Sequence, residues 1–433
     1  MENSEVAIKR RDFVKQLVGG AALAGIGLPL TARAEERRVK IGFCAPLTGD
    51  AAAWGLPGLY GCEIWVERLN AAGGVKIGDD NYLVELAAFD NQYDPRLALE
   101  GYRQLVESED VKFVMMLGGD TWGGVQDYAN RREMLTSTLL PSDLSIDAPY
   151  LVAPCEAHPI YNVTGVDWLG RNFPELKRAG ICAQADSLGD ISIATYIGAF
   201  DAIDIDVVKR TSFEFDTTDF APLVRGMLDA GVEVLCLDTA YSDYVDAITV
   251  EAFRQGFGGK IISCTCDNYR QLIAQTSAEF MENMIFQFPD FDDPALNGSF
   301  VNFEDPNRFY STYNERHPGT WSAVSWEYAS ILELWSKSAA RAGSVEPLDV
   351  LQAMKGEGRA PHAFGEASWW GEGFFGVNNA LVGNWPVVTI RDGRARIAEF
   401  IDILAWWEQH SDTLLRSMLK NRQMWYQRGY FTS

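Results

Sequence analysis

The sequence predicts an α/β protein made of two lobes, each with a mainly parallel sheet covered by helices. After residue 38, short apolar segments typical of strands alternate with amphipathic segments typical of helices, which is the pattern of βαβ units. The pattern starts again after residue 157 and runs through a second series of similar length. A chain of 433 residues is long enough for two such lobes.

The first lobe begins with an apolar strand that ends in a loop of small residues carrying Trp54. Pro95 in the first turn and a Gly-Gly stop at 73–74 support two of the helices that follow. The expected strands cover 39–47, 82–90, 111–118 and 134–142, and the expected helices cover 58–74, 94–108 and 121–133.

The second lobe repeats this alternation, and the later part of the chain then changes in amino-acid composition. Its expected strands cover 178–185, 206–213, 232–240 and 259–266, and its expected helices cover 160–173, 191–203, 220–231 and 244–257. A strand over 283–291 follows and begins the expected return to the first lobe. Two helices over 307–318 and 322–343 return the chain to the first lobe, an aromatic segment of strand character covers 368–390, and a helix covers 403–430.

The N-terminus has the features of an export signal. Arg10 and Arg11 precede Phe13, a short apolar stretch rich in glycine follows, and Ala32-Arg33-Ala34 forms a small-residue cleavage site. This arrangement resembles the twin-arginine signal, which exports folded proteins. The alternative is a membrane anchor, but the stretch is short for one. We expect a cleaved signal over 1–34 and a periplasmic mature protein.

Composition limits the classes of partner. The formal net charge of −23 disfavours nucleic acids and anionic membrane surfaces. The seven cysteines include Cys44, Cys182 and Cys236 in apolar strand-like segments, where small buried side chains are expected. Cys264 and Cys266 have no partner pair at zinc-ligand spacing. We therefore expect no metal site and no cofactor.

Motifs of catalysis are not evident in the sequence. It contains neither a Gly-x-Ser-x-Gly elbow nor a Gly-x-x-x-x-Gly-Lys phosphate loop. Gly371 to Gly376 match Gly-x-Gly-x-x-Gly, but strand character follows them, whereas a dinucleotide loop opens a helix. The four histidines are scattered, and His158, beside Pro159, is interpreted as a hinge residue rather than a base.

An ordered set of segments resembles the periplasmic Leu/Ile/Val-binding protein family. The set is KIGFCAPLTGDAAAWG, a helix ending in NAAGGV, a strand ending in FDNQYDP, and FVMMLGG, and the similarity is dense from Val39 to about Gly119. The resemblance implies the type I periplasmic binding protein fold, with two Rossmann-like lobes joined by three crossovers near 154–160, 276–284 and 370–380. It implies a non-enzymatic receptor that closes on a small ligand and delivers it to an ABC permease and its ATPase.

With this fold, the expected boundaries follow from the order of the segments. The N-terminal lobe would comprise 35–157 and 283–372, and the C-terminal lobe would comprise 158–282 and 373–400. Residues 401–433 would form a helical tail.

The resemblance also implies which positions touch the ligand. Trp54 would lie against it from the first loop, and Asp120 with Thr121 would hold its polar end after the third strand. The remaining positions are Ser142 and Asp143 after the fourth strand, Leu188 and Tyr241 at aromatic positions of the second lobe, and Asp267 where an acid receives an amino group.

Two of these positions depart from an amino-acid receptor. Asp120 and Asp143 would repel a ligand carboxylate, because burying unpaired charge is costly. This favours an amine, an amide, an alcohol or a neutral aromatic compound. The alternative is that both aspartates are helix N-caps.

Two other functions stay open at this level. The protein could be a sensory receptor that reports its ligand to a membrane kinase. It could also be a periplasmic enzyme exported folded with a cofactor, although the sequence shows no ligands for one.

Overall fold

A computed structural model describes residues 37–238 and 242–428, without the side chain of Asp50. The expected export signal over 1–34 and the predicted ligand contact Tyr241 lie outside these residues. No helix in the described part of the chain is both long and apolar enough to cross a membrane.

The first lobe is built on a six-stranded sheet with strand order β2-β3-β1-β4-β5-β6. All neighbours are parallel except β2, which pairs antiparallel with β3. The strands are β1 (Arg37–Ala45), β2 (Val75–Ile77), β3 (Asp80–Asp90), β4 (Val114–Met116), β5 (Thr136–Ser137) and β6 (Leu151–Val152). The helices between them are η1 (Asp50–Trp54), α1 (Leu56–Ala71), α2 (Pro95–Glu107), α3 (Asp120–Arg131) and η2 (Pro141–Asp143).

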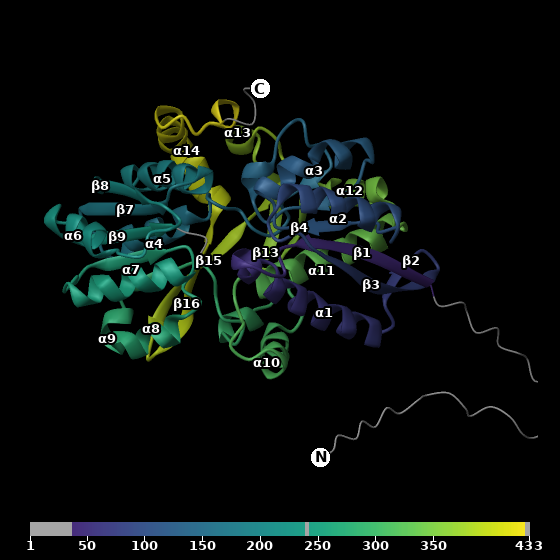
Figure 1. Ribbon diagram of the computed structural model, residues 1–433, viewed down its shortest axis with the longest axis horizontal. Helices are drawn as coiled ribbons and strands as arrows, with labels where there is room; N and C mark the ends of the chain where they lie inside the picture. Colours follow the sequence, from purple (N-terminus) through teal and green to yellow (C-terminus); the bar gives the residue numbers. More distant parts are fainter. Residues whose placement is uncertain (1–36, 239–241, 429–433) are drawn as a thin grey trace, which may run out of the picture. The chain divides into compact units, whose positions relative to one another are not determined.

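The second lobe is built on a seven-stranded sheet with strand order β16-β15-β11-β10-β9-β7-β8. Its strands are β7 (Arg178–Gln184), β8 (Asp206–Phe213), β9 (Val234–Asp238), β10 (Lys260–Ser263), β11 (Met284–Phe286), β15 (Asn384–Arg391) and β16 (Arg394–Asp402). Its helices are α4 (Asn162–Asn172), α5 (Ser187–Asp201), α6 (Ala221–Asp229), α7 (Ser242–Arg254), α8 (Tyr269–Gln275) and α9 (Ala278–Met281). The α/β prediction of two lobes with mainly parallel sheets is therefore confirmed (Figure 1).

A third, three-stranded sheet extends the first lobe. It has the order β12-β13-β14, and Ala153 after β6 pairs in parallel with Ala380 in β14. The elements of this part are η3 (Pro294–Asn297), α10 (Pro306–Arg316), α11 (Val324–Ala342), α12 (Pro347–Lys355), β12 (Arg359–His362), β13 (Gly365–Trp370), α13 (Glu372–Phe375) and β14 (Ala380–Val382).

The described chain passes between the two lobes three times. It leaves the first lobe between β6 and α4, returns after β11, and passes back between β14 and β15 at Gly383. The second and last passages fall just after the ranges 276–284 and 370–380 expected from the sequence. The first passage carries Glu156 and His158, which places both side chains between the lobes.

The C-terminal helix belongs to the second lobe by its packing. Helix α14 (Ile403–Lys420) lies beside α5 at the top of Figure 1, and η4 (Trp425–Gln427) follows it. The hydroxyl of Ser417 donates to the carbonyl of Ala194 at 2.7 Å. A side chain at Gly198 would come within 2.8 Å of Leu414, so the small residue lets the two helices approach closely.

The aromatic segment 368–390 is less regular than the sequence predicts. Two strands frame a one-turn helix, α13, because Gly371 and Gly376 have φ angles of 130° and 90° that break the extended chain. The rings of Phe374 and Phe375 are fully buried. The glycine pattern here is therefore explained by the packing of two phenylalanines.

Candidate functional site

A cavity lies between the two lobes, at the carboxyl ends of their parallel strands. The segments that follow β1, β3, β4 and β5 line it from the first lobe, and the ends of β7 to β11 line it from the second. The carboxyl ends of parallel strands in each sheet meet at one edge, which is where open α/β sheets bind ligands. The cavity is narrow in this arrangement of the lobes, with a volume of about 90 Å³ for the centres of water-sized spheres.

Trp54 enters this cavity from the turn of 3-10 helix that follows β1. The turn folds back tightly, since a side chain at Gly55 would lie 2.0 Å from the carbonyl oxygen of Pro46. Only glycine permits this approach. Trp54 remains half-buried and lines both this cavity and a neighbouring one.

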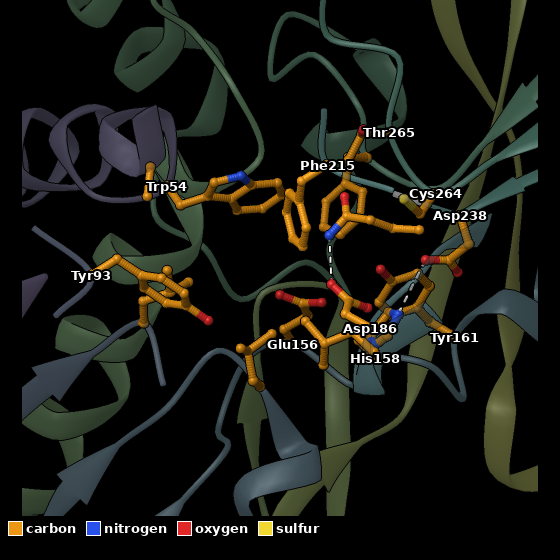
Figure 2. Close-up of a pocket in the computed structure, with 16 residues that line it drawn as sticks. Trp54, Tyr93, Glu156, His158, Tyr161, Asp186, Phe215, Asp238, Cys264 and Thr265 are labelled. Carbon is orange, nitrogen blue, oxygen red and sulfur yellow. Dashed lines mark hydrogen bonds and ion pairs between the residues drawn. The ribbon is translucent and has the colours of Figure 1, made fainter. Parts of the chain in front are cut away.

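Other aromatic side chains surround the cavity in Figure 2. Tyr93 comes from the loop after β3, where its φ of 60° is held by a backbone hydrogen bond to Asn91 Oδ1 at 2.9 Å. Tyr161 packs edge-on against Phe288, with ring centroids 5.4 Å apart. Phe215 lies just after β8 and exposes 51% of its surface. The lining thus offers rings from both lobes.

A buried polar network occupies the floor of the cavity (Figure 2). His158 Nε2 lies 2.8 Å from the hydroxyl of Ser192 and 3.5 Å from Asp238 Oδ1. The other oxygen of Asp238 accepts from the amide of Asn162 at 2.7 Å. Glu156, two residues before His158, is 5% exposed and belongs to the same lining.

The electrostatics of this network favour a protonated imidazole. Burial alone disfavours the charged form of His158, but the carboxylates of Asp238, Glu156 and Asp186 raise the pKa of His158 above its usual value. Burial raises the pKa of Glu156 well above its usual range, and His158 and Tyr161 oppose this in part. The first crossover therefore brings titratable groups that depend on one another to the base of the cavity.

Asp186, at the edge of the cavity, is the N-cap of helix α5. Its carboxylate caps helix α5 by accepting from the backbone of Gly189 at 2.7 Å, and it also accepts from Gln184 Nε2 at 2.5 Å. The cap satisfies a backbone donor that the helix itself cannot pair.

Asp267 lines the neighbouring cavity, which Trp54 also lines. Asp267 accepts from the hydroxyl of Ser242 at 3.2 Å, and burial raises its pKa to about 7. The lining also includes residues 319–324, which precede and begin α11. Asp267 therefore lies between the second lobe and the segment before α11.

A model of the periplasmic binding protein family matches residues 38–395, most of the chain. The chain belongs to the periplasmic binding protein family. This is a family of solute-binding proteins, and the two-lobed fold with a cavity between the lobes agrees with it. The resemblance inferred from the sequence is thereby confirmed.

Solved structures of periplasmic binding proteins share this fold at low sequence identity. An ABC transporter substrate-binding protein from Sphaerobacter thermophilus superposes with a TM-score of 0.68 and 17% identity, over 84% of this chain and 98% of its own. LivJ from Streptococcus pneumoniae, in complex with isoleucine, has a TM-score of 0.66 and 18% identity, over 84% of this chain and 100% of its own. A solute-binding protein from R. palustris, in complex with 4-hydroxybenzoate, has a TM-score of 0.65 and 16% identity, over 84% of this chain and 96% of its own.

The predicted contact residues of this periplasmic binding protein lie in different places. Trp54 and Leu188 line the cavity between the lobes, and Asp267 lines its neighbour. Asp120 is exposed in the first turn of α3, and Thr121 is buried, with its hydroxyl donating to the carbonyl of Gly118 at 2.7 Å. These last two side chains do not belong to the described lining.

Ser142 and Asp143 line a separate cavity beside α3. Asp143 Oδ2 accepts from the backbone of Gly119 and from the hydroxyl of Thr138, both at 2.9 Å. Asp143 thus holds the residue that precedes α3, across 24 positions of sequence. The alternative reading of Asp143, as the N-cap of the helix that follows it, therefore does not describe these contacts.

The sequence analysis missed Glu156, Asp186 and Asp238 as lining residues. Asp186 and Asp238 stand at the ends of predicted strands, so strand position could have indicated them. Glu156 lies in a crossover segment without a repeating pattern. Its only sequence signal is its closeness to His158 and Pro159 at the passage between the lobes.

Proposed function

We propose that this protein captures a small organic molecule in the cavity between its lobes and delivers it to an ABC transporter in the inner membrane. The observation that carries the proposal is the convergence of strand ends from both lobes on one cavity. A ligand there would touch both lobes and would favour the closed arrangement. Closure would supply the state that a permease recognises.

Several side chains would contact the ligand under this proposal. Trp54 would cover its apolar part from the first lobe, and Leu188 would contact it from the second. Asp267 would approach only a ligand long enough to pass Trp54 into the neighbouring cavity. The role would be non-enzymatic, in keeping with a family of solute-binding proteins.

The site of action would be the periplasm. The twin-arginine-like stretch at Arg10 and Arg11 would direct the folded chain there, and the ligand-loaded protein would meet its permease at the outer face of the inner membrane. Cell fractionation of the full-length protein tests this placement.

A thermal-shift screen of the purified protein tests ligand capture. The panel should contain amines, amides, alcohols, amino acids and aromatic acids, since a ligand that binds only the folded state raises Tm by mass action. A reproducible rise confirmed by calorimetry supports the proposal. Uptake of the labelled ligand by cells with and without the gene then separates transport from sensing, because a sensory receptor would leave uptake unchanged.

A further inference from the structure

The charges that line the cavity are unbalanced. Three carboxylates face it, and the one side chain among the described lining residues that can carry a positive charge is His158. The neighbouring cavity contributes Asp243 and Asp267 and no lysine or arginine among its described lining. With a chain charge of −23, the potential in and around the cavity favours cations.

Two of the three carboxylates have hydrogen-bond donors within the protein. Asp238 faces His158 and accepts from Asn162, and Asp186 caps α5 and accepts from Gln184. These contacts explain why both acids can be held near a buried site without a ligand.

Glu156 differs from the other two acids. Its carboxyl group has a hydrogen bond with the hydroxyl of Tyr161 and lies within the electrostatic reach of His158. Unlike the other two acids, it accepts from no N–H donor in the described residues. In Figure 2 the carboxylate points into the space below Trp54 and Phe215. A buried carboxylate aimed into a cavity requires a positive partner or a proton.

The N-terminus of α5, at this carboxylate-rich edge, is already capped by an acid. A ligand carboxylate could otherwise bind the unpaired backbone N–H groups of this helix. The carboxylate of Asp186 accepts from Gly189 at 2.7 Å. A carboxylate ligand would therefore meet an acid at this helix N-terminus.

The rest of the lining suits a cation with an apolar body. Trp54, Tyr93, Tyr161, Phe215 and Phe288 present rings to the cavity. The face of an aromatic ring attracts an ammonium or quaternary ammonium group, most strongly where water is excluded.

We propose that the ligand is a small organic cation, an amine or quaternary ammonium compound without a carboxylate, whose charged head lies against Glu156 while its body contacts the ring of Trp54. The inference rests on the proposed function, since it names the ligand class of the same cavity. It separates this chain from relatives of its fold that were solved with isoleucine or 4-hydroxybenzoate.

Pairs of compounds with the same shape and different charge test the proposal. Choline is compared with 3,3-dimethylbutan-1-ol, and benzylamine with benzyl alcohol and benzoate, by calorimetry on the full-length protein. Leucine and 4-hydroxybenzoate complete the panel. We expect at least one cation to bind about tenfold or more tightly than its neutral partner.

A glutamine variant ties the preference to one side chain. Glu156→Gln should lower the affinity for the cation by about tenfold and leave that for the neutral partner within about twofold. The control is Glu333→Gln, which changes a buried glutamate on α11 that does not line the cavity. This control should bind the cation as the wild type does.

Proton release gives a second readout. Glu156 is surrounded by His158 and Tyr161 from the crossover, Asp238 from β9 and Glu327 from α11. A cation that pairs with Glu156 should drive protons off this cluster, so the binding heat at pH 7 should depend on the ionisation enthalpy of the buffer. The dependence should be weaker in Glu156→Gln.

The outcomes separate the two proposals. Tighter binding of a neutral or carboxylate compound than of its cationic partner overturns the inference and leaves solute binding intact. Equal loss of cation and neutral binding in Glu156→Gln also overturns it, since this would be a structural effect. The absence of binding by every member of the panel contradicts the proposed function itself.

Discussion

His158 Nε2 and Asp238 Oδ1 lie 3.5 Å apart at the floor of the cavity, and both residues are more than nine-tenths buried. The pair joins two distant parts of the chain, since His158 lies in the first crossover and Asp238 at the end of β9. The crossover is thereby fixed to the second lobe by a polar contact in addition to apolar packing.

This pair predicts a change in the titration of one histidine. Asp238→Asn should lower the pKa of His158 below its usual value of 6.5, because burial would then outweigh the remaining carboxylates. Two-dimensional NMR of the imidazole resonances between pH 5 and 9 measures the shift.

His362 is the internal control for this experiment. Burial lowers the pKa of His362 to about 4, and its Nε2 lies 2.8 Å from the carbonyl oxygen of Cys155. Its resonances should not titrate above pH 5 in either protein. If His158 titrates identically with and without the aspartate, the pair does not set its charge.

Trp54 is predicted to contribute to binding without being needed for folding. Trp54→Ala should weaken the best ligand by about tenfold to a hundredfold, because one aromatic wall of the cavity is lost. Titration calorimetry measures the affinity. Trp168→Ala is the matched control, since Trp168 is a half-buried tryptophan on α4 that packs against Phe173 and does not line the cavity. Equal weakening in both variants would rule out a specific contact.

The alternation of strands and helices made the position of the cavity predictable. Because ligand sites in such folds lie at the carboxyl ends of strands, the segments after two predicted strands, which carry Trp54 and Leu188, could be chosen from the sequence. The same reasoning could not place Asp143, whose contact with Gly119 depends on how two loops of the first lobe meet. It also could not identify Glu156, because a crossover has no periodic pattern and its burial arises only when the two lobes are assembled.

The buried acid Asp143 predicts an inverted dependence of stability on pH. Burial raises its pKa in the folded protein to about 7, from an ordinary value near 3.8. The folded state therefore holds a proton that the unfolded state releases, and the free energy of unfolding falls as the pH rises from about 4 to about 7. Above that range the effect is constant.

Asp143→Asn isolates this effect. The amide oxygen can still accept from Gly119 and Thr138, but the group no longer titrates. The stability of the variant relative to the wild type should increase between pH 4.5 and 8, by up to about 3 kcal/mol. Urea unfolding at both pH values measures this difference. If the difference in stability between the variant and the wild type is the same at pH 4.5 and at pH 8, Asp143 is ionised in the folded protein at both pH values.

The contact between α1 and α11 depends on Gly61. A side chain there would lie 1.8 Å from the carbonyl oxygen of Ser325, and backbone cannot move aside as a flexible side chain can. Gly61→Ala should therefore destabilise the protein by about 3 kcal/mol, because the two helices must separate.

Gly123 on α3 is the matched control for this substitution. It is also inside a helix, but an added side chain would meet nothing within 4 Å. Gly123→Ala should stabilise the protein by about 0.5–1 kcal/mol, since alanine has the higher helix propensity. Urea unfolding of both variants compares them directly. The chemical change is the same in both variants. Changes of opposite sign in the free energy of unfolding would show that position 61 requires glycine because α11 approaches closely, and not because of helix propensity. Changes of the same sign would contradict this explanation.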